Sequence, residues 1–261
     1  MARLLVIAGS DSSAGAGIQA DLKTAQAFGV YAQTAITAVT VQDTRGVHGV
    51  ETISAPGVKR QIEAALGDIG ADAIKIGMLG SGPIATAVAS ALEDIALPLV
   101  LDPVLVSSSG RALLDDRGVE IMKSRLLPCA FLVTPNWPEC KALTGILPEN
   151  DLELEKAAKA LLQLGARYVL IKGGHGEGDT VRDVLIEENG QISIFESPRQ
   201  QTRHTHGTGC VLSTAIACGL AQGKTLIESV RRAHDFVQHA IKTAPGLGSG
   251  NGPLNLSSSQ S

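Results

Sequence analysis

Residues 204–221 read HTHGTGCVLSTAIACGLA, in which a polar segment with two glycines runs directly into an apolar helix pattern. The backbone N–H groups of a first helical turn have no partner within the helix, and the helix dipole adds partial positive charge there. Gly207 and Gly209 let the backbone approach a phosphate closely. Cys210 falls in the first turn, where a thiolate is favoured. The stretch therefore predicts an anion site at a loop-to-helix junction.

Before this junction, short β-branched or aliphatic runs alternate with longer helical patterns, which predicts a mostly parallel sheet covered by helices on both faces. Asn189-Gly190 separates two short apolar runs and predicts an antiparallel hairpin at one edge of the sheet. Because we find no repeat or long linker, we expect one α/β domain over residues 1–245, followed by a loosely ordered tail over residues 246–261. Strands are expected near residues 4–8, 34–41, 73–76, 98–101, 130–133 and 168–172, and helices near residues 16–28, 57–69, 82–93, 116–125, 137–143, 152–164, 209–221 and 225–243.

The composition restricts the kinds of partner. With 22 Lys+Arg against 26 Asp+Glu in 261 residues, the chain has no basic excess for nucleic acid. The apolar run at residues 3–8 is too short for a membrane span or a signal peptide. The four cysteines form no C-x-x-C pair and favour a reduced, cytoplasmic protein. We therefore expect a cytoplasmic protein with a small ligand and neither a nucleic-acid nor a membrane partner.

Polar residues follow nearly every predicted strand, and ligands of open α/β sheets bind beyond the carboxyl ends of the strands. Gln42 follows the second strand, and its amide offers both a donor and an acceptor to a heterocycle. Its alternative is a plain exposed glutamine. Lys75 interrupts an apolar strand, so it belongs either to the site or to a buried ion pair.

Three oxygen-bearing side chains follow later strands. Asp102, Asn136 and Glu139 together offer the ligands that Mg²⁺ requires beside a nucleotide. The alternative for Asn136 and Glu139 is a helix cap and its capping-box partner. Lys172 ends another strand and offers a cation to a transferred phosphate, the alternative being an exposed lysine in a turn. His175, His204 and His206 lack acidic or thiol partners at metal spacing, so we favour hydrogen-bonding roles for them.

Taken as a set, these motifs resemble the hydroxymethylpyrimidine/phosphomethylpyrimidine kinases of thiamine biosynthesis, within the ribokinase-like superfamily. The resemblance implies a three-layer αβα fold with a mostly parallel sheet, and a homodimer. It also implies transfer of phosphate from ATP, with Mg²⁺, to 4-amino-5-hydroxymethyl-2-methylpyrimidine and then to its monophosphate. The segments that carry it cover the chain up to residue 245: residues 8–13, 15–23, 42–44, 75–78, 102–104, 134–136 with Glu139, 172–175 and 205–210.

The resemblance also implies the site residues. The family's pyrimidine site falls on Gly9, Asp21, Gln42, Met78 and Val104. Its nucleotide and magnesium site falls on Asp102, Asn136, Glu139, Lys172 and Thr208, with Asp102 and Glu139 as metal ligands. The transfer site falls on Gly207, Thr208, Gly209 and Cys210 together with Lys172. Cys210 is the implied base, and we expect the helix N-terminus to lower its pKa toward neutrality.

Other functions remain open at this point. A pyridoxal or pyridoxine kinase would act on a hydroxymethyl group on a similar ring. A catalytically silent pyrimidine-binding regulator would keep the pocket, although the retention of Asp102, Lys172 and Cys210 disfavours it. A thiol hydrolase using Cys210 and His206 is disfavoured because His206 precedes the helix. The glycine- and serine-rich segments 105–115 and 173–180 are the candidate lids.

Overall fold

The strand β1 (Arg3–Asp11) carries the apolar run expected of a central strand and is buried on both faces. In the computed structural model, which describes residues 1–107 and 110–257, β1 pairs in parallel with β2 (Tyr31–Asp43) and β4 (Ala73–Ile76). Parallel pairing continues through β5 (Leu99–Leu101), β6 (Leu132–Val133) and β7 (Tyr168–Ile171). The mostly parallel sheet predicted from the alternating pattern is therefore confirmed.

Antiparallel strands close both edges of this sheet. The predicted hairpin is confirmed as β8 (Thr180–Glu187) and β9 (Ile192–Pro198), which follow β7. At the opposite edge β3 (Gly46–Thr52) pairs with β2, a strand that the sequence did not predict. Two glycines in its seven residues weaken its β propensity. Within the described residues the order of the nine-stranded sheet is β3-β2-β1-β4-β5-β6-β7-β8-β9.

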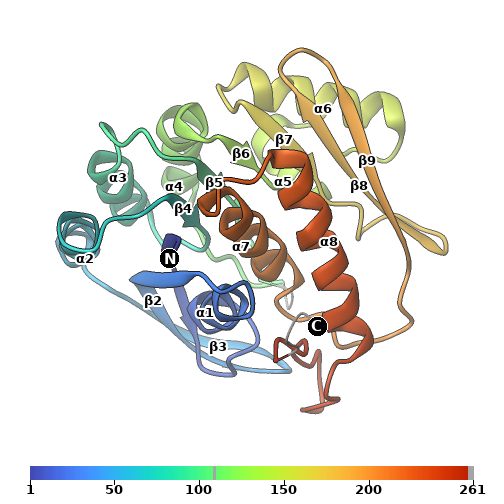
Figure 1. Ribbon diagram of the computed structural model, residues 1–261, viewed down its shortest axis with the longest axis horizontal. Helices are drawn as coiled ribbons and strands as arrows, with labels where there is room; N and C mark the ends of the chain where they lie inside the picture. Colours follow the sequence, from blue (N-terminus) through green and yellow to red (C-terminus); the bar gives the residue numbers. More distant parts are fainter. Residues whose placement is uncertain (108–109, 258–261) are drawn as a thin grey trace.

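Helices cover both faces of the sheet, which makes a three-layer αβα fold. One face packs against α2 (Ala55–Gly67), α3 (Gly82–Ala91), α4 (Asp116–Ile121), α5 (Trp137–Thr144) and α6 (Asp151–Gln163). The other face packs against α1 (Gly17–Ala27), α7 (Thr208–Ala221) and α8 (Leu226–Lys242), which lie side by side in Figure 1. The predicted fold class is confirmed.

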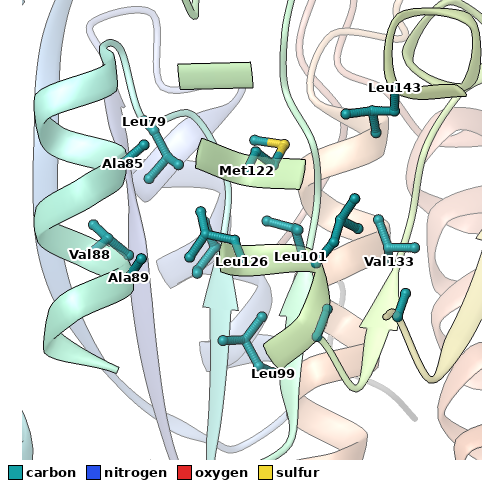
Figure 2. Packing of buried hydrophobic residues seen from close by; sticks show 14 of the residues in the cluster. Leu79, Ala85, Val88, Ala89, Leu99, Leu101, Met122, Leu126, Val133 and Leu143 are labelled. Carbon is teal, nitrogen blue, oxygen red and sulfur yellow. The ribbon is translucent and has the colours of Figure 1, made fainter. Parts of the chain in front are cut away.

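The alternation of β1 divides the core in two. Leu5 and Ile7 belong to the cluster under α2 to α6, whereas Leu4 and Val6 belong to the cluster under α1, α7 and α8. Figure 2 shows part of the first cluster, with Val88 of α3 beside the side chains from the sheet. The two clusters bury both faces of the strands, and the carboxyl ends of the strands therefore have defined positions in the sheet.

Two segments differ from the sequence expectations. The helix expected over residues 116–125 is α only as far as Ile121 and continues as a π turn (Met122–Leu126) and a 3-10 turn (Leu127–Cys129), in which Pro128 lacks the N–H that an α-helix needs. The tail was expected to be loose over residues 246–261, but Leu254 and Leu256 are buried against the domain, whereas residues 246–249 are exposed. Its last residues, 258–261, lie outside the described part of the chain. Among the described residues, no helix combines the length and apolarity that a membrane crossing requires.

Candidate active site

The carboxyl ends of the parallel strands and the N-terminus of α7 surround one cavity of about 740 Å³. Ligands of open α/β sheets bind at this edge. The cavity brings together all but one of the predicted site residues. Those that line it are Gly9, Gln42, Met78, Asp102, Val104, Asn136, Glu139, Lys172, Gly207, Thr208, Gly209 and Cys210.

Asp21 is the predicted site residue that does not line the cavity. Its carboxylate is fully buried, with both oxygens 3.0 Å from Nζ of Lys75, and it accepts a hydrogen bond of 2.6 Å from the Thr214 hydroxyl. Burial raises the pKa of Asp21, and the Lys75 charge opposes the rise. Asp21 is therefore placed as the counter-ion of Lys75, which differs from the direct substrate contact that the resemblance implied. The interpretation of Lys75 as part of a buried ion pair is therefore confirmed, and because Lys75 also lines the cavity, a role in the site stays a prediction.

The junction before α7 has the geometry expected of an anion site. Gly207 caps the helix at φ 88°, and a Cβ there would overlap the carbonyl oxygen of Gly15, so only glycine fits. The N–H of Thr208 is engaged with the Thr205 oxygen at 3.3 Å. Those of Gly207, Gly209 and Cys210 find no acceptor within the described residues. Three of the four backbone donors of segment 207–210 are thus available to an anion.

Lys172 and two carboxylates lie beside this junction. Nζ of Lys172 is 2.8 Å from Oδ1 of Asp102 and 3.6 Å from Oε2 of Glu139. A Cβ on Gly209 would lie 3.2 Å from Nζ of Lys172 and 3.6 Å from Oδ2 of Asp102, so the glycine junction, the cation and the acid are in contact range. The predicted grouping of α7 with Asp102 and Lys172 is therefore observed.

The charges in this group perturb one another. Although burial acts in the opposite direction, the carboxylates of Asp102 and Glu139 raise the pKa of Lys172, which stays a cation. Burial raises the pKa of Glu139 to about 7 against the opposing charge of Lys172, and Asp102 adds to the rise. Strongly shifted carboxyl groups of this kind are typical of functional sites.

Asn136 and Glu139 form the helix cap that was one of their two interpretations, while their role beside a nucleotide stays a prediction. Oδ1 of Asn136 accepts from the Glu139 N–H at 2.9 Å, and Oε2 of Glu139 accepts from the Asn136 N–H at 2.7 Å, which completes a capping box on α5. Both side chains also line the cavity. The cap fixes Glu139 at the point where it meets Lys172.

The pKa of Cys210 differs from the sequence expectation, which was a pKa lowered toward neutrality by the helix N-terminus. Burial raises the pKa of this half-buried thiol to about 11, although the Lys75 charge opposes the rise and the Gly17 backbone N–H also acts to lower it. Asp21 and Asp102 add negative charge nearby, which also disfavours a thiolate. The helix N-terminus alone therefore does not bring the thiol to neutrality, because desolvation is the larger effect.

The end of the cavity near β1 and β2 is apolar with one amide. Met78 packs with Ala38 and Leu113, and a Cβ on Gly9 would lie 2.9 Å from Sδ of Met78. Gly9 therefore keeps space open beside that thioether. Oε1 of Gln42 accepts a hydrogen bond of 3.1 Å from the Thr40 hydroxyl, which holds the amide in the cavity wall, and its Nε2 lies 3.1 Å from Nε2 of His206.

His206 and Asp11 form a clamp that sequence reasoning missed. Nε2 of His206 is 2.9 Å from Oδ2 of Asp11, and the same carboxylate accepts from the N–H groups of Gly15 and Ala16. Hydrogen bonds from His206 and Ser13 outweigh the effect of burial and lower the pKa of Asp11. The clamp joins the loop after β1 to the junction before α7. Small residues in that loop and a histidine before the glycine were the signal available in the sequence.

Parts of both candidate lids line the cavity. Ser107 and Gly110 come from the segment 105–115, in which residues 108–109 lie outside the described residues. Gly174 and His175 come from the segment 173–180. The Arg199 guanidinium donates to the carbonyl oxygens of Gly174, Gly176 and Gly178 at 3.0, 2.7 and 2.8 Å. Closure of either segment over a ligand stays a prediction.

Known proteins share both the sequence and the fold. The family described as phosphomethylpyrimidine kinase matches residues 11–255. The hydroxymethylpyrimidine/phosphomethylpyrimidine kinase of Streptomyces coelicolor is 44% identical over 252 residues, covering 97% of this chain and 93% of the relative. That of Haemophilus influenzae is 44% identical over 257 residues, covering 97% and 96%.

Solved structures of vitamin kinases have the same fold as this chain. The phosphomethylpyrimidine kinase from Clostridium difficile 630 superposes with a TM-score of 0.82 at 40% identity, covering 92% of this chain and 100% of that one. The pyridoxal kinase from Staphylococcus aureus in complex with ADP superposes with a TM-score of 0.90 at 35% identity, covering 98% and 93%. The glycine junction, the Lys172 cluster and the family match over nearly the whole chain lead to one conclusion: this chain belongs to the phosphomethylpyrimidine kinase family.

Proposed function

We propose that the protein transfers phosphate from ATP to the hydroxymethyl group of 4-amino-5-hydroxymethyl-2-methylpyrimidine, and then to the resulting monophosphate, in thiamine biosynthesis. One observation carries the proposal: a single cavity joins the apolar end around Met78 to the anion site at Gly209 and Lys172, with Cys210 in its lining. Relatives at 44% identity that are named for both phosphorylations support it.

In this proposal the pyrimidine ring lies against Met78 and Val104, and Gln42 hydrogen-bonds to its edge. The acceptor oxygen attacks the γ-phosphorus in line while the bond to the leaving ADP breaks, and its proton passes to Sγ of Cys210 in the minor thiolate form. The free N–H groups of Gly209 and Cys210 and the Lys172 ammonium stabilise charge on the transferred group. Phosphoryl transfer asks mainly for positioning and charge neutralisation of this kind.

Asp102 and Glu139 are suited to hold Mg²⁺ together with the nucleotide. Within the described residues, no group of three or more His, Cys, Asp or Glu side chains forms a metal cage. Mg²⁺ characteristically takes one or two carboxylates and completes its shell with phosphate oxygens and water, so this donor set fits it. When bound, the ion supplies further neutralisation of the phosphate charge. Lys172, which lies between the two carboxylates, holds them together.

Pyridoxal phosphorylation is the second candidate. It is favoured by the TM-scores of 0.89 to 0.90 with pyridoxal kinases, at 35–36% identity. An assay of ADP release over both alcohols separates the candidates. We expect kcat/KM to be higher for the hydroxymethylpyrimidine than for pyridoxal. The reverse order would assign the chain to pyridoxal phosphorylation, and no ADP release with either alcohol would leave the silent regulator.

A homodimer is supported by an exposed apolar face. Val39 and Val41 of β2 are 43% and 58% exposed, and β2 is flanked by the edge strand β3. Exposed valines on a sheet next to an open edge mark an interaction surface. We expect light scattering to give the mass of two chains, and Val41→Glu to give that of one chain. A wild-type monomer at assay concentration would remove the dimer from the proposal.

We propose a cytoplasmic location, which the state of the cysteines supports. All four cysteines are free, and two of them, Cys140 and Cys218, are buried. Free thiols are typical of a reducing compartment, so we place the enzyme in the cytoplasm.

A further inference from the structure

The C-terminal tail returns to the cavity after α8 ends. Leu254 and Leu256 are buried in the cluster under α1, α7 and α8, and the N–H of Asn255 donates to the carbonyl oxygen of Ala240 at 3.1 Å. These anchors lead residues 250–253 past the end of the cavity near β2, where Asn251 is part of the lining. Terminal segments are mostly loose unless contacts of this kind tie them down.

The first contact of the tail is with the turn between β2 and β3. The N–H of Asn251 donates to the carbonyl oxygen of Thr44 at 2.8 Å, and the N–H of Gly250 donates to the Thr44 hydroxyl oxygen at 3.2 Å. A Cβ on Gly250 would overlap the Thr44 carbonyl oxygen, so this close approach requires glycine. Gln42 precedes Thr44 by two residues, and the tail therefore holds the end of the strand that carries the Gln42 amide.

The second contact is with the segment before α7. The N–H of His206 donates to the carbonyl oxygen of Gly252 at 3.2 Å, and His206 pairs with Pro253 in an isolated β-bridge. A Cβ on Gly15 would lie 2.5 Å from Cδ2 of His206 and 3.3 Å from Cβ of Pro253, so the loop after β1 packs against the same point. The ring of this histidine is the one that lies 3.1 Å from the Gln42 amide nitrogen.

We propose that residues 250–253 are positioning residues of the acceptor site, which hold the Gln42 amide at the edge of the pyrimidine ring through Thr44 and His206. The inference rests on the proposed function, in which Gln42 hydrogen-bonds to that ring. One continuous segment hydrogen-bonds to both neighbours of the amide. The tail takes the N–H of His206 and leaves the free N–H groups of the glycine junction to the phosphate, so its contribution falls on the alcohol and not on ATP.

Two glycine variants separate the tail from its contacts one at a time. Gly250→Ala sets a Cβ against the Thr44 carbonyl oxygen, and Gly252→Ala sets one against Nδ1 of His204. Both variants keep the buried anchors Leu254 and Leu256. The midpoint of urea unfolding shows whether either variant has a folding defect, and the other variant then carries the test.

The expected effect is on KM for the alcohol. We expect each glycine variant to raise KM for the hydroxymethylpyrimidine about 10-fold, the size of one lost hydrogen bond, with kcat and KM for ATP little changed. Ser249→Ala is the matched control in the same tail, because the side chain of Ser249 is exposed and its carbonyl oxygen keeps the contact with Arg203. A wild-type KM in both glycine variants would overturn the inference.

A double-variant cycle shows whether the tail acts through Gln42. In a Gln42→Leu background the amide is absent, so Gly250→Ala and Gly252→Ala should raise KM for the alcohol no further. A general loosening of the structure would instead multiply the two increases. That multiplicative result would overturn the positioning role.

A binding measurement separates this inference from the proposed function. Calorimetric titration of the hydroxymethylpyrimidine into the protein with ADP bound needs no turnover. Binding that is weakened in the glycine variants of a protein that transfers no phosphate would defeat the proposed function and leave the role of the tail standing. Turnover of the pyrimidine with a wild-type KM in both glycine variants would do the opposite.

Discussion

Cys210→Ala is expected to lower kcat by about 10²–10⁴-fold, the usual contribution of a general base, while ATP binds as tightly as in the wild type. The thiol lies in the first turn of α7, beside the free N–H groups of Gly209 and Cys210. Alanine keeps those backbone donors and removes only the proton acceptor. The loss should therefore appear in kcat, with little change in the nucleotide Kd.

The pH profile should identify the same group. Because burial raises the pKa of Cys210 to about 11, the thiol is almost entirely protonated at neutral pH. A thiol about four pH units below its pKa is ionised to about one part in 10⁴, and this fraction rises tenfold per pH unit. We expect wild-type kcat/KM for the alcohol to rise steadily from pH 7 to pH 9, and Cys210→Ala to lose this rise apart from the contribution of Glu139, whose pKa is raised to about 7.

Cys129→Ala is the control, since Cys129 is exposed and lies outside the cavity lining. It should keep both the rate and the pH profile of the wild type. Normal turnover in Cys210→Ala would remove the thiol from the mechanism and leave catalysis to the anion site. A loose transition state needs little early deprotonation, so this outcome has a physical basis.

The sequence predicted the frame of the molecule because each strand carries its own signal. β1 and β7 are apolar runs bounded by polar residues, and Asn189-Gly190 marks the hairpin. β3 escaped prediction because a glycine-containing edge strand is stabilised by pairing with β2, which is a tertiary contact. The tail escaped because the burial of Leu254 and Leu256 depends on where the chain returns to the domain.

The positions of site residues that directly follow a strand could be predicted from the sequence. Their pKa values and their partners could not, because these depend on burial and on tertiary contacts. Asp102 follows β5 and Lys172 follows β7, two parallel strands separated by β6, and their side chains meet at the carboxyl edge of the sheet as expected. The pKa of Cys210 depends instead on how much desolvation its surroundings impose, which no spacing in the sequence reveals. Asp21 matches a position of the family's motif, from which a substrate contact was expected. In the structure its partner is Lys75, 54 residues away, and this tertiary contact could not be read from the motif.

The buried pair of Lys75 and Asp21 leads to the largest expected effect on stability. Both side chains are fully buried, and Nζ of Lys75 lies 3.0 Å from each Asp21 oxygen. Lys75→Met would leave the carboxylate buried without its cation, a change that typically costs about 3–5 kcal/mol. We expect the free energy of unfolding in urea at pH 7 to fall by that amount.

The pH dependence gives the sign of the effect. Burial already raises the pKa of Asp21 in the folded state, and removal of the Lys75 charge takes away the main opposing effect. A carboxyl whose folded pKa is raised destabilises the fold as pH rises through that pKa. The deficit of Lys75→Met should therefore be smallest in acid, where Asp21 is protonated, and should grow toward neutral pH.

Two further variants identify the cause. Asp21→Asn combined with Lys75→Met removes both charges and should recover much of the lost stability, because no buried ion remains. Lys59→Met is the matched control, since Lys59 pairs with Glu63 on an exposed helix face and such pairs contribute little. If Lys75→Met were as stable as Lys59→Met, the buried pair would not be a source of stability. If the double variant were no more stable than Lys75→Met, the deficit would come from packing of the lysine chain rather than from the unpaired carboxylate.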